Sequence, residues 1–170
     1  MSPLVRRSWS PRGQTPVLRQ RGRSRRKVSV IGALVISPRR LRVRACFGLL
    51  PDANYDGEAI LAFLKELSRA VRGPIELIWD RLRAHHRGPV GAWLAQSRRV
   101  HAHLLPPYAP ELNPVELIWG HAKMNPLANF APAELQELLM RTRRVTRDIA
   151  GNQPLLRAFI QHGSLPLRLR

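Results

Sequence analysis

Two acidic residues, Asp80 and Glu116, stand where the chain would hold a carboxylate rigidly enough to do chemistry. Asp80 ends an apolar run that begins at Pro74, and Glu116 falls on the first turn of a predicted helix. Mg²⁺ prefers carboxylate oxygens, and acids fixed by a rigid sheet form a suitable cage for it. The 35 residues between the two acids leave room for a helix, a strand and a loop. The pair is therefore a candidate metal site.

The helix that carries Glu116 has clear start signals. The three prolines before Leu112 predict extended chain and exclude helix there. Asn113 is a good N-cap, and Pro114 suits the first helical position because no backbone donor is lost. One apolar stripe then follows at helical spacing: Val115, Ile118, Trp119 and Ala122. A second interpretation of Glu116 stays open, since a Glu three residues after an Asn cap can simply complete a capping box.

The segment that carries Asp80 is predicted to be a buried strand. The run 74–79 is rich in Ile, Leu and Trp and follows a Gly-Pro break. Catalytic groups in open α/β sheets gather at the carboxyl ends of strands. Asp80 is placed at such an end.

These segments resemble a known family, the DDE transposases. The resemblance is carried by Trp79-Asp80 with His85 five residues later, by Leu105 to Glu116, and by Trp119 and Lys123, and it extends over roughly residues 1 to 145. It is strongest to bacterial insertion-sequence transposases related to the mariner group. Arg81 and Arg83 depart from the pattern, because the family usually has small or neutral residues there.

The resemblance implies an α/β fold, a ribonuclease-H-like layered sheet with flanking helices. It also implies metal-dependent DNA cleavage and strand transfer with Mg²⁺ or Mn²⁺ as cofactor. The family uses three acids, and Asp80 and Glu116 match the second and third. No Asp or Glu precedes Asp52, so we expect this chain to be a C-terminal part truncated before the first, central strand, inactive alone. It would then work with the upstream part of the same transposase or as a homo-oligomer.

The charge of the chain independently predicts a polyanionic partner. The net charge is +18, and residues 1–50 contain 13 Lys or Arg and no acid. Nucleic acid fits better than a membrane surface, because no long apolar run exists. The residues predicted to contact DNA phosphates are Arg23, Arg25, Arg26, Lys27 and Lys123. The N-terminus has no apolar signal segment, and the predicted location is the cytoplasm.

Hydrophobic patterning divides the chain into three predicted parts. Residues 1–27 are a basic arm, 28–130 an incomplete catalytic core, and 131–170 C-terminal helices. The core begins with a hairpin of strands 28–36 and 41–50, followed by an amphipathic helix over 54–72. A helix over 89–96 and a strand over 99–105 precede the Glu116 helix, and further helices are predicted at 133–148 and 155–162.

Two other functional classes remain open. A non-enzymatic basic nucleic-acid binder, or a regulator left from the element, would explain the charge equally well. A different nuclease of ribonuclease-H-like fold would also use the two carboxylates. His101 and His103 alternate onto one face of a strand, but without further ligands at metal spacing they are predicted to be surface residues.

Overall fold

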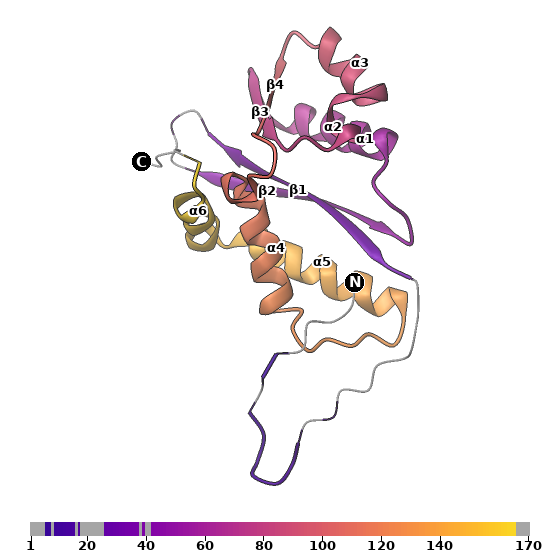
Figure 1. Cartoon of the computed structure of the whole chain (residues 1–170), viewed down its shortest axis with the longest axis vertical. Coiled ribbons are helices and arrows are strands. Elements are labelled where there is room, and N and C mark those ends of the chain that lie inside the picture. The colour runs from indigo at the N-terminus through magenta and orange to yellow at the C-terminus, as the bar shows by residue number, and fades with distance from the viewer. Residues whose placement is uncertain are drawn as a thin grey trace.

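The structure is a computed structural model, and it describes residues 6–7, 9–15, 17, 26–37, 39 and 42–165. Figure 1 shows a long hairpin through the middle of the molecule, with one group of helices on each side of it. In chain order the elements are β1 (Val28–Ile36), β2 (Val43–Pro51), α1 (Gly57–Ala70), β3 (Ile75–Trp79), α2 (Arg83–His86), α3 (Gly88–Gln96), β4 (Val100–Leu104), η1 (Pro110–Leu112), α4 (Pro114–Met124), α5 (Leu135–Gly151) and α6 (Gln153–His162).

Two small sheets are present within the described residues. β1 and β2 pair antiparallel from Val28 opposite Pro51 to Ile36 opposite Val43. β3 and β4 pair parallel, with Trp79 opposite Leu104 at their carboxyl ends. The backbone hydrogen bonds of the described strands form these two pairs and do not join them into one sheet. The protein is therefore a mixed α/β structure with small sheets and flanking helices, as the sequence predicted at that level.

One face of the hairpin forms the larger core. Leu34, Ala45 and Phe47 on this face pack against buried residues of α4, α5 and α6. The alternation in β2 is the physical reason, because Val43 is fully buried while Arg44 beside it is exposed. α4, α5 and α6 lie together on this side in Figure 1.

The opposite face of the hairpin meets α1, which links it to the second core. Ile31 packs against the cluster formed by α1, α3 and β3, whose most buried members are Ile60 and Val90. The side chain of Asp56 caps α1 by accepting from the N–H of Ala59 at 2.9 Å. β3 and β4 lie with α1 and α3 in the upper part of Figure 1.

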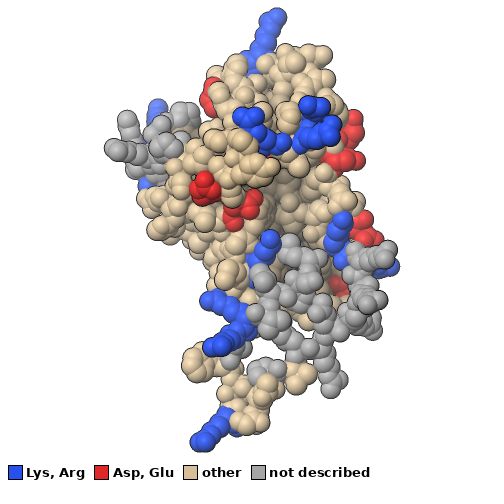
Figure 2. All heavy atoms as spheres, in the orientation of Figure 1, with Lys and Arg blue, Asp and Glu red and all other residues tan. Residues whose placement is uncertain are grey.

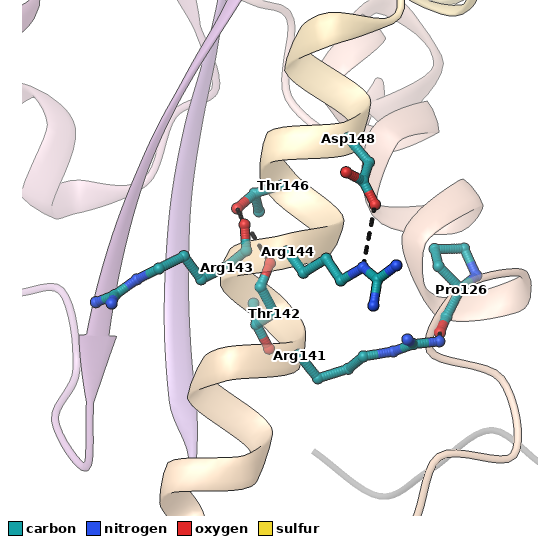
Figure 3. Close-up of polar contacts among 7 residues, drawn as sticks. All are labelled: Pro126, Arg141, Thr142, Arg143, Arg144, Thr146 and Asp148. Carbon is teal, nitrogen blue, oxygen red and sulfur yellow. Dashed lines mark hydrogen bonds and ion pairs between the residues drawn. The ribbon is translucent and has the colours of Figure 1, made fainter.

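Polar contacts along α5 attach this helix to the segment after α4. Arg141 donates to the carbonyl of Pro126 at 2.8 Å and lies 5.7 Å above the ring of Phe130. Thr142 and Thr146 are buried and donate to carbonyls one turn earlier, at Leu138 and Thr142. Figure 3 shows Arg141 and Arg144 on one side of the helix and Arg143 pointing away from them.

The structure corrects one local expectation. The three prolines before Leu112 predict no helix there, yet Pro110–Leu112 form a single 3-10 turn. Pro110 begins that turn, where its missing N–H costs nothing. None of the helices in the described part of the chain has both the length and the apolar character needed to cross a bilayer.

Candidate metal and DNA site

Asp80 lies directly after β3, at the carboxyl end of the β3–β4 pair, as its sequence position predicted. Its Oδ1 atom accepts a hydrogen bond from the N–H of Leu82 at 2.9 Å. The side chain remains 54% exposed. The local turn thus orients the carboxylate and leaves it open to solvent.

His85 is the nearest ionisable partner of Asp80. Its Nδ1 atom lies 2.8 Å from Oδ1 of Asp80, although the angles are not those of a hydrogen bond. The imidazole stacks on the indole of Trp79, with ring centroids 4.5 Å apart and planes inclined by 6°. Trp79 is itself buried, so a fixed aromatic surface holds His85 beside the acid.

The chain leading to Glu116 starts beside Asp80. The N–H of Leu105, just after β4, donates to the carbonyl of Trp79 at 2.8 Å. The carbonyl of Leu105 accepts from Nε of Arg81 at 2.9 Å. Arg81 therefore ties the ends of the two strands together, and no local sequence pattern indicates this role.

Glu116 lies in the first turn of α4, as predicted. The side chain of Asn113 caps the helix by accepting from the N–H of Val115 at 3.1 Å. Glu116 is exposed, and its carboxylate makes no hydrogen bond or ion pair with any described residue. The capping-box interpretation is therefore not supported, because the Glu does not reach back to its cap.

The fit of this site to a metal ion is partial. Carboxylate oxygens are the donors that Mg²⁺ and Mn²⁺ favour. However, no group of three or more His, Cys, Asp or Glu within the described residues is arranged to hold a metal. The carboxylates of Asp80 and Glu116 are the type of ligand that these ions bind. Two carboxylates are fewer ligands than a metal site of this type needs.

The predicted DNA-contacting residues differ in their exposure and in their contacts. Lys27 donates to the side-chain oxygen of Asn54 at 2.5 Å, and Arg26 beside it is exposed. Lys123 is half-buried in the last turn of α4. Arg23 and Arg25 lie outside the described residues. Figure 2 shows Lys and Arg spread over the visible face, without one dominant patch.

The two histidines of β4 are surface residues, as predicted. His101 and His103 are exposed, and Nε2 of His103 lies 2.6 Å from a carboxylate oxygen of Glu76 on β3. Both side chains of this pair are more than half exposed, so the contact contributes little to stability.

Comparison with protein families gives one match. The model for the DDE superfamily endonucleases matches residues 2–138. That family acts on DNA and typically uses a divalent metal ion. Comparison with curated proteins gave no match. Because the family match spans most of the chain, this protein belongs to the DDE superfamily endonuclease family.

Proposed function

We propose that the chain is part of a transposase of a bacterial insertion sequence related to the mariner group, acting on DNA in the cytoplasm. In this proposal it takes part in DNA strand cleavage and strand transfer, and Asp80 and Glu116 bind Mg²⁺ or Mn²⁺. The observation that carries the proposal is an exposed carboxylate at each of the two motif positions, within the segment that matches the family. Glu116 supports the proposal most, because its carboxylate is exposed and makes no contact that would explain it structurally among the described residues.

Each residue has a separate task in this proposal. The Leu82 N–H and the stacked His85 orient the Asp80 carboxylate. The capped start of α4 presents Glu116 on a rigid element. A bound metal ion would supply positive charge at the attacking and leaving oxygens of the phosphodiester. Arg23, Arg25, Arg26, Lys27 and Lys123 would hold the DNA through its phosphates.

Two carboxylates do not complete the usual ligand set. The described residues offer no third acidic ligand near this pair. We therefore propose a ribonuclease-H-like arrangement in which further ligands come from the DNA or from protein outside the described residues. The chain alone would bind metal weakly and would not cut DNA.

Mn²⁺ binding tests the proposed ligands without requiring activity. The fraction of bound Mn²⁺ would be measured by electron paramagnetic resonance, with duplex DNA present. Asp80→Asn and Glu116→Gln should each weaken binding by about tenfold, since each removes one ionised ligand. Asp56→Asn and Glu58→Gln are matched controls, because Asp56 also accepts a backbone N–H and Glu58 also lies exposed in a first helical turn.

The outcomes separate the two parts of the proposal. Equal Mn²⁺ binding by the wild type and both site variants would remove Asp80 and Glu116 as ligands. Metal-dependent nicking by the unaltered chain, abolished by Asp80→Ala, would instead show that two carboxylates suffice.

A second candidate is a DNA-binding protein without catalytic activity. It is favoured by the net charge of +18 together with the incomplete ligand set among the described residues. In that case DNA would bind in a salt-dependent way, and no variant at Asp80 or Glu116 would alter Mn²⁺ binding.

A further inference from the structure

Tyr108 is the most exposed large side chain near the candidate site. Its residue exposure is 101%, so its ring makes almost no contact with the rest of the described protein. Its backbone φ is +58°, a conformation that is uncommon for a bulky residue and costs energy. Pro106 and Pro107 precede it and Pro110 follows, which restricts the chain on both sides. The loop thus holds an aromatic ring out in solvent at a cost to folding.

This loop connects the two candidate carboxylates. It leaves β4 at Leu105, which bonds to Trp79 next to Asp80, and it enters α4 just before Glu116. The loop that carries Tyr108 therefore runs from the strand end beside Asp80 to the helix that carries Glu116.

Other exposed apolar side chains occur close in sequence to the two candidate carboxylates and to the start of the loop. Among the described residues, exposed large hydrophobic side chains occur two residues on either side of Asp80, at the end of β4 and directly after Glu116. They are Ile78, Leu82, Leu104 and Leu117. A ligand that offered phosphates alone would leave these apolar side chains in water. A ligand with flat, partly apolar groups would cover them.

We propose that Tyr108 is a binding position for an unpaired nucleobase of the DNA substrate, stacked on the phenol ring. The proposal rests on the proposed function, because it takes DNA as the ligand of this site. Stacking of a base on an aromatic side chain is worth about 1–3 kcal/mol and tolerates any sequence. A base inside a duplex is already stacked on both faces, so the ligand must contain an unpaired segment. The restricted loop and the two side-chain torsions of Tyr keep the entropic cost of binding small.

The test compares three fluorescein-labelled DNAs at one salt concentration, with affinity measured by anisotropy. They are a blunt duplex, the same duplex with four unpaired nucleotides at one end, and the single strand. Tyr108→Ala should weaken binding of the two DNAs with unpaired bases by about 5- to 150-fold, the range that 1–3 kcal/mol corresponds to. Binding of the blunt duplex should change by less than about twofold. Tyr108→Phe keeps the ring and should bind all three DNAs like the wild type.

Two additions guard the test against indirect effects. Tyr108→Gly removes the ring yet adopts φ of +58° without strain, so it should match Tyr108→Ala in binding while retaining the fold. A 2-aminopurine placed in the unpaired segment reports stacking directly, and its change in fluorescence on binding should be smaller with Tyr108→Ala.

The results distinguish this inference from the function on which it rests. If the wild type binds DNA and Tyr108→Ala binds each of the three DNAs as tightly as the wild type does, Tyr108 is not a base-binding position and DNA remains the ligand. If Tyr108→Ala weakens the duplex as much as the unpaired DNAs, selective base stacking is wrong. A wild type that binds no DNA even at low salt would overturn the proposed function and this inference together. Binding of an apolar peptide at Tyr108 with no preference for unpaired DNA would assign the surface to a protein partner.

Discussion

Asp80 and Glu116 are both exposed acids, but the structure treats them differently. The Asp80 carboxylate is oriented by the N–H of Leu82 and by His85, whereas the Glu116 carboxylate has no partner among the described residues. The guanidinium Nε of Arg81 donates to the carbonyl of Leu105. Arg81 therefore has a structural role beside Asp80, because its hydrogen bond connects the ends of β3 and β4.

Part of this residue-scale picture could be predicted from the sequence. The end of β3 at Asp80 and the N-cap at Asn113 follow from local rules about strand ends and caps. The stacking of His85 on Trp79 could not, because it depends on tertiary packing. The left-handed backbone of Tyr108 could not either, because no sequence rule places a bulky residue at positive φ. The assignment of metal binding to Asp80 and Glu116 stays a prediction.

Arg99 stabilises the C-terminal end of α1, a role that the sequence pattern does not predict. Its guanidinium donates to the carbonyl of Ser68 in the last turn of α1 and to those of Val71 and Gly73 after it. Arg99→Ala should lower the free energy of unfolding by about 1–2 kcal/mol, because it leaves these carbonyls without their charged donor. Urea unfolding measures the change. Arg98→Ala removes a neighbouring exposed arginine and should change it by less than about 0.5 kcal/mol; equal losses from the two variants would contradict this role.

At the scale of elements, α4 is positioned by packing on the β1–β2 hairpin. Ile118 is fully buried, and Trp119 lies 6.0 Å from the ring of Phe47 on β2. The sequence predicted this stripe from its helical spacing. The close approach of Trp119 to β1 was not predicted, because it requires the absence of a side chain at Gly32.

Gly32 gives a direct test of how α4 is seated. A Cβ at this position would lie 2.9 Å from the Trp119 ring and 3.1 Å from Phe47. Gly32→Ala should therefore destabilise the protein by about 1–3 kcal/mol through overpacking. Adding Trp119→Phe removes the clashing ring and should recover part of the loss beyond additivity, measured by thermal unfolding in a double-mutant cycle. Strict additivity of the two changes would mean that α4 does not rest on Gly32.

The attachment of α5 depends on one of its arginines. Arg141 donates to the carbonyl of Pro126 and lies over the ring of Phe130, whereas Arg143 makes neither contact and points away from Arg141 in Figure 3. Arg141→Ala should cost about 1–2 kcal/mol of stability, because it removes a charged hydrogen bond and the cation–π interaction. Arg143→Ala should be nearly neutral in the same urea titration. A larger effect of Arg143→Ala would contradict this division of roles.

Element boundaries show where sequence rules end. The predicted helix over 54–72 is shorter in the structure, Gly57–Ala70, because Asp56 caps its start and the backbone is extended at Val71. The short helix α2 is not predicted, since four residues give too little periodicity. Leu61 of α1 is buried in the cluster that this helix forms with β3 and α3, a contact that helical periodicity alone does not predict.

At the scale of the whole molecule, charge is the dominant property. A net charge of +18 predicts DNA binding that weakens steeply with salt. Replacing four of the nine cations of the basic arm, residues 1–27, by Ala should lower the salt slope of log Kd by about 0.9 for each phosphate that the variant no longer neutralises. These are Arg23, Arg25, Arg26 and Lys27.

An equal change of charge elsewhere provides the control. The control variant replaces four exposed cations of α1 and the segments around it by Ala: Lys65, Arg69, Arg72 and Arg98. Anisotropy titrations from low to physiological salt should show a smaller change in slope for this variant. The basic arm would have no special role if both variants changed the slope equally.

The overall arrangement could be predicted only in part. The order of elements follows from periodicity and breaks, and the mixed α/β class is confirmed. The relation between the two strand pairs is not encoded in local patterns. The ribonuclease-H-like arrangement and the division at residues 27 and 130 therefore stay predictions.

The central claim is that Asp80 and Glu116 bind the same metal centre. Its most direct measurement is a crystal structure of the protein with duplex DNA and Mn²⁺, with the ion located by anomalous scattering. We expect carboxylate oxygens of both residues at about 2.0–2.2 Å from a Mn²⁺ ion, or from a pair of ions about 3.5–4 Å apart. Carboxylates more than about 8 Å apart, too far to share such a pair, or Mn²⁺ bound elsewhere, would contradict the claim.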